Sequence, residues 1–185
     1  VGDLQIPNQI KKAYQLAADH NMAGPYLHRL MHTIFYSNKR VAQETSFRDG
    51  AASVSYATVA LAEELSQALA APKVLILGLG EIGIDVCKNF EDKDFAEVTV
   101  MNRTLEKAER IAQGKKFRVA PFEDMCKEVE AADIIISSVR TDSPIITQEK
   151  LKAMQLLSFK YFIDLSVPRS IEDGVEKVSG VLLYN

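Results

Sequence analysis

Three glycines near the middle of the chain have the spacing of a phosphate-binding loop. The pattern is GxGxxG, with residues Gly78, Leu79, Gly80, Glu81, Ile82 and Gly83. It follows a short apolar run and precedes an amphipathic stretch, where a strand would pass into a helix. Glycines there permit a tight turn and let a diphosphate approach the backbone, and the helix N-terminus attracts negative charge. The loop predicts a dinucleotide site; a glycine turn without a ligand is the alternative.

The residues after the next apolar run indicate which dinucleotide is bound. An NAD site places Asp or Glu there for the ribose 2′-hydroxyl, whereas this chain has Asn102, Arg103 and Thr104. Arg103 can pair with a 2′-phosphate and stack on adenine, which a carboxylate would repel. Asn102 and Thr104 can add hydrogen bonds, and Thr104 can also cap the helix that follows. We therefore predict NADPH as cofactor; a solvated Arg103 is the alternative.

Two further segments end apolar runs and belong at the same predicted sheet edge. Ser137, Ser138 and Val139 end one run, and Val167 and Pro168 follow another. Cofactors of such folds lie at the carboxyl ends of the strands, so both segments are candidate cofactor contacts. A backbone carbonyl of the Val167–Pro168 segment can reach a nicotinamide amide. Ordinary turn chemistry is the alternative for the two serines.

Alternating apolar runs and helical patterns must position these residues. Strands are predicted at residues 73–78, 97–101, 117–120, 133–138, 160–165 and 180–184, and helices at 81–91, 104–113, 122–130 and 147–157. Strands that alternate with helices indicate an α/β fold with a Rossmann-type, doubly wound parallel sheet. Helical patterns at 8–20, 25–43 and 53–70 come first. We therefore expect a helical segment at 1–50, the end of a preceding domain, and an NADP-binding Rossmann domain at 51–185.

Composition excludes several classes of protein. The 185 residues are 47% hydrophobic and 25% charged, with a formal net charge of −3, as in ordinary globular domains and unlike a nucleic-acid-binding surface. No apolar run is long enough to span a membrane, and no signal peptide is present.

Cys87 and Cys126 lie far apart within helical patterns, so we expect reduced packing residues and a cytoplasmic location. His28 and His32 have no third ligand, so no metal site is predicted.

Several blocks resemble glutamyl-tRNA reductase, a family that reduces glutamyl-tRNA in tetrapyrrole (porphyrin) synthesis. Residues 39–45 (KRVAQET) and 50–57 (GAASVSYA) are similar to family motifs, as are 132–138 (ADIIISS) and 163–169 (IDLSVPR). The blocks occur in the family's order and extend from Gln5 to Asn185. The glycine loop is shared by many dehydrogenases, whereas residues 53–57 and 163–169 are more specific. The departures are Ala42 and Gln43, residues 139–141, and Ser170, where the family usually has Asp.

The resemblance implies an NADPH-dependent reduction of glutamyl-tRNA to glutamate-1-semialdehyde. In the family a cysteine of an N-terminal domain forms a thioester, and NADPH then delivers hydride. Neither Cys87 nor Cys126 matches that cysteine, so no catalytic residue is assigned here. The chain begins at Val1 without an initiator Met and ends after an apolar run, so we expect a piece of a longer enzyme. It should bind NADPH without turnover, while glutamyl-tRNA binding and homodimerisation belong to missing parts.

Two other functions remain open. One is an NADP-dependent dehydrogenase of the shikimate dehydrogenase kind, which also carries a glycine loop and an AsnArgThr block. That class needs a substrate domain before the Rossmann half, whereas this chain begins with helical patterns and no strands. The other is a non-catalytic NADP-binding module. An upstream segment with a cysteine would favour the reductase over both.

Overall fold

The computed structural model describes residues 5–45, 53–154 and 156–185, and the chain forms two compact units, residues 1–57 and 58–185. The expected domain boundary at residues 50 and 51 lies outside the described residues. No helix in the described ranges is long and apolar enough to cross a membrane. The units are described one at a time.

The first unit contains two antiparallel helices, α1 (Gln5–Asp19) and α2 (Pro25–Glu44). Asn21 ends the turn after α1 with a left-handed φ of 54°, a conformation that asparagine tolerates at a helix C-terminus. Pro25 begins α2, where its missing N–H is not needed by the helix. The ring of Tyr14 packs against those of His28 and Phe35, which holds the two helices together.

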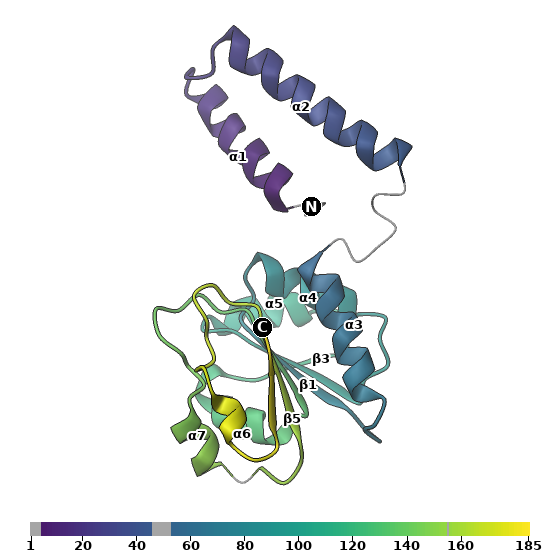
Figure 1. The fold of residues 1–185 in the computed structure, drawn as a ribbon, viewed down its shortest axis with the longest axis vertical. Helices are drawn as coiled ribbons and strands as arrows, with labels where there is room; N and C mark the ends of the chain where they lie inside the picture. The colour runs from purple at the N-terminus through teal and green to yellow at the C-terminus, as the bar shows by residue number, and fades with distance from the viewer. Residues whose placement is uncertain (1–4, 46–52, 155) are drawn as a thin grey trace. The chain divides into compact units, whose positions relative to one another are not determined.

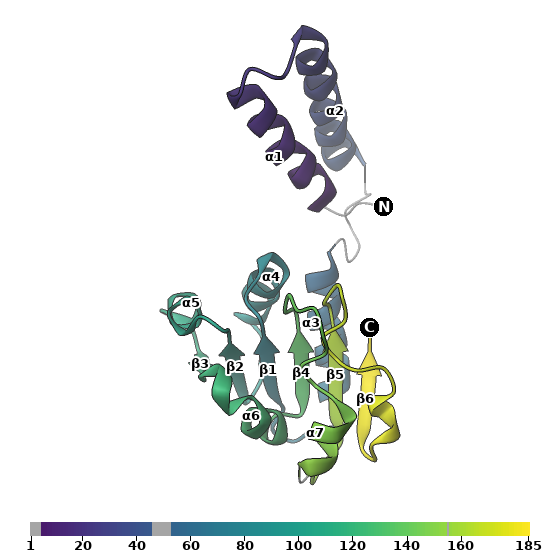
Figure 2. The ribbon, with the colours of Figure 1, turned by 90° about the vertical axis from the view of Figure 1, so that its left-hand side faces the viewer.

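The second unit is built on a parallel sheet with the strand order β3-β2-β1-β4-β5-β6 (Figure 2). The strands are β1 (Lys73–Leu77), β2 (Glu97–Met101), β3 (Phe117–Val119), β4 (Ile134–Ser137), β5 (Lys160–Asp164) and β6 (Val181–Tyr184). From β1 the chain first builds outward through β2 and β3, then returns to the other side of β1 with β4. This is the doubly wound Rossmann arrangement that the sequence predicted, with a topological switch between β1 and β4.

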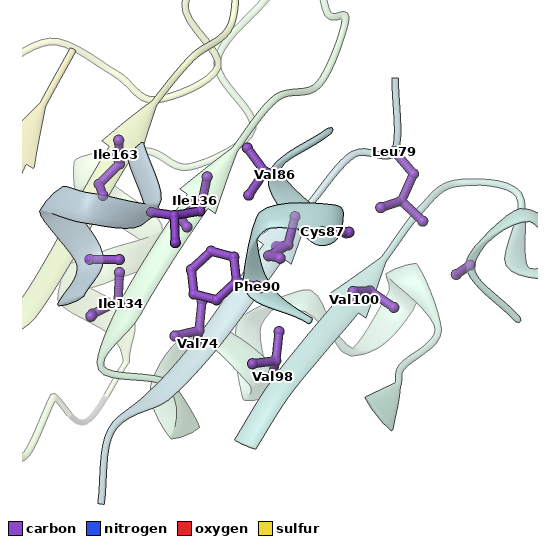
Figure 3. Packing of buried hydrophobic residues seen from close by; sticks show 14 residues of the cluster. Val74, Leu79, Val86, Cys87, Phe90, Val98, Val100, Ile134, Ile136 and Ile163 are labelled. Carbon is purple, nitrogen blue, oxygen red and sulfur yellow. The ribbon is translucent and has the colours of Figure 1, made fainter. Parts of the chain in front are cut away.

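Helices cover both faces of this sheet (Figure 1). The helices are α3 (Val54–Ser66), α4 (Glu81–Phe90), α5 (Leu105–Ala112), α6 (Met125–Ala131) and α7 (Gln148–Ala153), with short 3-10 turns η2 (Phe122–Asp124) and η3 (Val175–Lys177). Side chains of α3, α4 and α5 pack on one face with Val74 and Ile76 of β1 (Figure 3). Leu75 and Leu77 point to the other face, where α6 and α7 pack. This alternation explains why the strand is apolar throughout.

Two helices end earlier than the sequence predicted. The helix expected at 53–70 ends at Ser66, whose hydroxyl donates a hydrogen bond to the carbonyl of Glu63 and so competes with the helical backbone. The helix expected at 147–157 ends at Ala153, and Met154 is extended. Met154 and Leu156 instead pack against the core on the α6 and α7 face, so tertiary packing overrides helical periodicity there.

Candidate functional site

The sheet register brings three loops to one place. Leu77, the last residue of β1, pairs with Met101 of β2 and with Ser137 of β4. Three neighbouring strands therefore end level with one another. The residues that follow them, Gly78, Asn102 and Ser138, must lie side by side at the carboxyl edge, where open α/β sheets hold their ligands.

Two of the three loop glycines are required by the fold itself. Gly78 has φ +86°, and a Cβ there would lie 2.7 Å from the carbonyl oxygen of Ser138. A Cβ on Gly83 would lie 2.0 Å from the carbonyl oxygen of Gly78, so only glycine lets α4 pack this closely on the loop. Both positions are therefore explained by packing and conformation, with or without a ligand.

Gly80 differs because nothing in the fold requires it. Its φ of −68° suits any residue, and the nearest atom to an added Cβ would be the carbonyl oxygen of Ser138 at 4.0 Å. It occupies the N-cap of α4, where no side chain caps the helix, and Glu81, Ile82 and Gly83 form the first turn. Backbone N–H groups and the positive end of the helix dipole therefore face open space beside a glycine, which fits a diphosphate group.

Asn102 builds the loop. Its side-chain oxygen accepts a hydrogen bond from the backbone N–H of Leu79 at 3.2 Å, and its side-chain nitrogen donates to the carbonyl of Thr104 at 3.1 Å. Ser138 supports the same loop, because its hydroxyl donates to the carbonyl of Gly78 at 3.1 Å. The expectation that Thr104 caps α5 is wrong: it occupies the N-cap position, but its side chain makes no capping hydrogen bond.

One pocket gathers half of the predicted site residues. Its lining includes Gly78, Leu79, Gly80, Asn102, Arg103, Ser138 and Val139. The Arg103 guanidinium is held at the rim, because its Nη2 donates a hydrogen bond to the carbonyl oxygen of Arg140 at 3.0 Å. Arg103 is exposed, and this bond positions its guanidinium beside the loop.

Three more residues line this pocket: Lys107, Phe122 and Arg140. None of the three was predicted as a cofactor contact. Lys107 lies in the first turn of α5, four residues after Arg103, and a second cation so close in sequence could have revealed it. Phe122 follows β3 and carries no such signal. Arg140, one of the departures from the family pattern, lies beside Arg103.

Ser137 does not reach the pocket. It is fully buried, and its hydroxyl lies 2.7 Å from that of Ser170. Ser170 in turn donates its hydroxyl hydrogen bond to Asp164 at 2.9 Å, and its backbone N–H donates to the same carboxylate at 2.8 Å. Backbone N–H groups of Ser166 and Ile171 also donate to Asp164. These four residues and Ser137, which we call the Asp164 network, fix the loop after β5.

The second predicted segment at this edge, Val167 and Pro168, follows β5 and does not line the pocket. The peptide bond between them is cis, and Val167 is 91% exposed. The hydroxyl of the neighbouring Ser166 accepts a hydrogen bond from the backbone N–H of Val139 at 3.1 Å. That bond ties the loop after β5 to the loop after β4, so the segment remains at the correct edge of the sheet.

Cys87 does not have the surroundings of a nucleophile. Cys87 is buried in the core under α4, and this burial raises the pKa of its thiol to about 12. Cys126 is exposed, so the prediction that both cysteines pack inside the protein is wrong for Cys126. His28 hydrogen-bonds through Nδ1 to the Tyr14 hydroxyl, and no three potential ligands gather into a metal site within the described residues.

Two family models match separate parts of the chain. Residues 60–185 match the model described as "Shikimate / quinate 5-dehydrogenase", which covers the parallel sheet and the pocket. Residues 1–45 match the "Glutamyl-tRNAGlu reductase, N-terminal domain".

The chain is similar along its whole length to parts of longer proteins. It is 54% identical over 186 residues to a glutamyl-tRNA reductase of Cytophaga hutchinsonii, spanning 100% of this chain but 44% of that protein. The glutamyl-tRNA reductase structure from Methanopyrus kandleri superimposes with a TM-score of 0.64 and 30% identity, over 100% of this chain and 47% of that one. The nucleotide-binding domain of the Thermoplasma volcanium reductase shares the fold, with a TM-score of 0.56 at 22% identity, over 72% of this chain and 87% of that one.

Proposed function

Because residues 60–185 belong to the shikimate / quinate 5-dehydrogenase family and the whole chain is homologous to glutamyl-tRNA reductases, we propose that it is the NADPH-binding part of a glutamyl-tRNA reductase. The chain spans less than half the length of the curated relatives that it matches. We propose likewise that the whole enzyme reduces glutamyl-tRNA.

One observation carries the choice of cofactor. The described lining of the pocket contains cations at Arg103, Lys107 and Arg140 and no carboxylate. A site for NADH would place an acidic side chain there to hold the ribose 2′-hydroxyl, and that acid would repel a 2′-phosphate. The position of Arg103 beside the glycine loop instead favours a phosphate on the adenosine ribose.

The chain's own residues would bind and orient the dinucleotide. Gly80 and the N-terminus of α4 would receive the diphosphate, and Arg103 the 2′-phosphate. The backbone of the loop after β5, including Val167, would lie toward the nicotinamide, whereas Val139 of the loop after β4 lines the pocket together with Arg103. Bound NADPH would supply the hydride that converts the glutamyl group on tRNA to glutamate-1-semialdehyde.

The remaining functions are assigned to other parts of the enzyme. We propose that the nucleophilic cysteine, the glutamyl-tRNA contacts and homodimerisation lie in the segments by which the relatives exceed this chain. A cytoplasmic location is proposed from the two unpaired cysteines, which suit a reducing compartment.

Titration of the chain with NADPH and NADH by calorimetry tests the cofactor. NADPH should bind more tightly, and Arg103→Ala should remove most of the difference. A charge-assisted phosphate contact contributes about 1.5–3 kcal/mol, so the NADPH affinity should fall about tenfold or more while the NADH affinity stays unchanged. Equal affinity of the unmodified chain for the two dinucleotides would contradict the proposal.

The name of the larger family model favours a second candidate, oxidation of shikimate or quinate with NADP. The match of residues 1–45 to a glutamyl-tRNA reductase domain argues against it. Incubation with NADP and either hydroxy acid should give no increase in NADPH absorbance. Steady reduction of NADP by shikimate would replace the reductase proposal with this one. If the full-length protein binds NADPH but catalyses neither reaction, the chain is a binding module.

A further inference from the structure

Two separate arms of the fold supply the cations of the pocket. Arg103 comes from the loop after β2 and Lys107 from the first turn of α5, whereas Arg140 comes from the loop after β4. That loop lies on the other side of the topological switch, since β4 pairs with β1 on the edge opposite β2. The pocket is therefore bounded by positive charge on two sides.

The two arms are joined directly. Arg103 donates its guanidinium hydrogen bond to the main-chain carbonyl of Arg140, not to its side chain. The bond fixes the Arg103 side chain against the β4 loop and leaves the guanidinium of Arg140 free for another partner. Substitution of the Arg140 side chain consequently leaves this bond in place.

No carboxylate of the described residues pairs with the cations of the pocket. Within the same ranges, no ion pair or side-chain hydrogen bond involves the side chains of Lys107 and Arg140, in contrast to Arg118 of β3, which pairs with Glu97 and Glu128. Three cations with no carboxylate in the lining repel one another, and an anion of more than one charge relieves this repulsion. A phosphate monoester carries about −1.5 to −2 charges at neutral pH and fits that need.

We propose that Arg140 is a specificity-determining residue that binds the 2′-phosphate of NADPH from the β4 side, together with Arg103 and Lys107 from the β2 side. This inference rests on the proposed function. The diphosphate of the same cofactor is already provided for by Gly80 and the N-terminus of α4, on the glycine-loop side of the pocket. Arg140 lies beside Arg103, and a guanidinium can bind a phosphate through two parallel hydrogen bonds.

The test compares Arg140→Gln with the unmodified chain in calorimetric titrations against four probes. The probes are NADPH, NADH, adenosine 2′,5′-bisphosphate and adenosine 5′-monophosphate. Arg140→Gln should weaken NADPH and the bisphosphate about five- to tenfold, where tenfold corresponds to ~1.4 kcal/mol, and should leave NADH and the monophosphate unchanged. Arg140→Lys, which keeps the charge, should recover part of the loss.

Arg110→Gln is the matched control, because Arg110 is an exposed residue of α5 that does not line the pocket. It removes the same charge and should change no affinity. Equal weakening of NADPH and NADH by Arg140→Gln would place Arg140 on the diphosphate and overturn the inference, as would no change at all. Both results leave the proposed function standing if the unmodified chain still prefers NADPH, whereas failure of that chain to bind NADPH would overturn both.

Discussion

The two halves of the carboxyl edge use their polar groups in opposite ways. On the β1 and β2 side, the end of α4 and the Arg103 side chain border an open pocket. On the β5 side, Asp164, Ser166 and Ser170 are buried and bonded to one another. The first half leaves charge exposed beside a pocket, and the second uses its polar groups to hold a loop in place.

This difference indicates which residues can be substituted to alter binding without loss of the fold. A polar group that the protein already satisfies contributes stability, and its removal leaves buried partners unpaired. A polar group that borders open space contributes little to folding and is available for binding. Substitutions on the two sides should therefore affect different measurements, the free energy of unfolding on one and cofactor affinity on the other.

The largest effect is expected for Asp164→Ala. It would leave three buried backbone N–H groups, those of Ser166, Ser170 and Ile171, without their acceptor. We expect a loss of about 3 kcal/mol or more in the free energy of unfolding, measured by denaturant titration. Asp173→Ala is the control, because Asp173 is an exposed carboxylate paired only with Arg169, and it should cost about 1 kcal/mol or less. Similar losses for both would abolish the contrast between the halves.

Gly80 and Gly83 test the same contrast within one motif. Gly83→Ala forces a Cβ to within 2.0 Å of a backbone oxygen and should destabilise the chain by about 1–3 kcal/mol. Gly80→Ala meets open space, so its melting temperature should match that of the unmodified chain while its NADPH affinity falls. Thermal denaturation and calorimetry on both variants check this. Full NADPH binding by Gly80→Ala would show that the diphosphate lies elsewhere.

The smallest effect is expected for Ser170→Ala. The substitution removes hydroxyl contacts to Asp164, Ser137 and Ser166 but leaves the backbone N–H of position 170 bonded to Asp164. We expect a loss of about 1 kcal/mol in the free energy of unfolding and an unchanged affinity for NADPH. A tenfold loss of NADPH affinity with normal stability would mean that the Asp164 network also acts on the ligand.

The strands and the glycine loop could be predicted because local sequence determines them. A strand buried on both faces is apolar at every position, as in β1, and the loop glycines follow it directly. The order of strands and helices then specifies a parallel sheet, and the carboxyl edge follows from that. Arg103 was predicted for the same reason, since it comes immediately after a strand.

What could not be predicted depends on which way a side chain points and on contacts between distant residues. Ser137 and Ser138 are adjacent, but Ser137 shares the α6 and α7 face with Ile135, while Ser138 turns toward Gly78. A run of two serines gives no sign of which one is buried. Phe122 reaches the pocket only because β3 lies beside β2, and Ser170 acquires its role only when Asp164 is near.

The bonds of Asn102 also limit how the cofactor preference could be re-engineered. Its side chain uses an acceptor for Leu79 and a donor for Thr104, and aspartate can supply only the acceptor. Position 103, whose side chain holds no part of the glycine loop, is the better place to begin, because a change at the rim of the pocket leaves the loop intact.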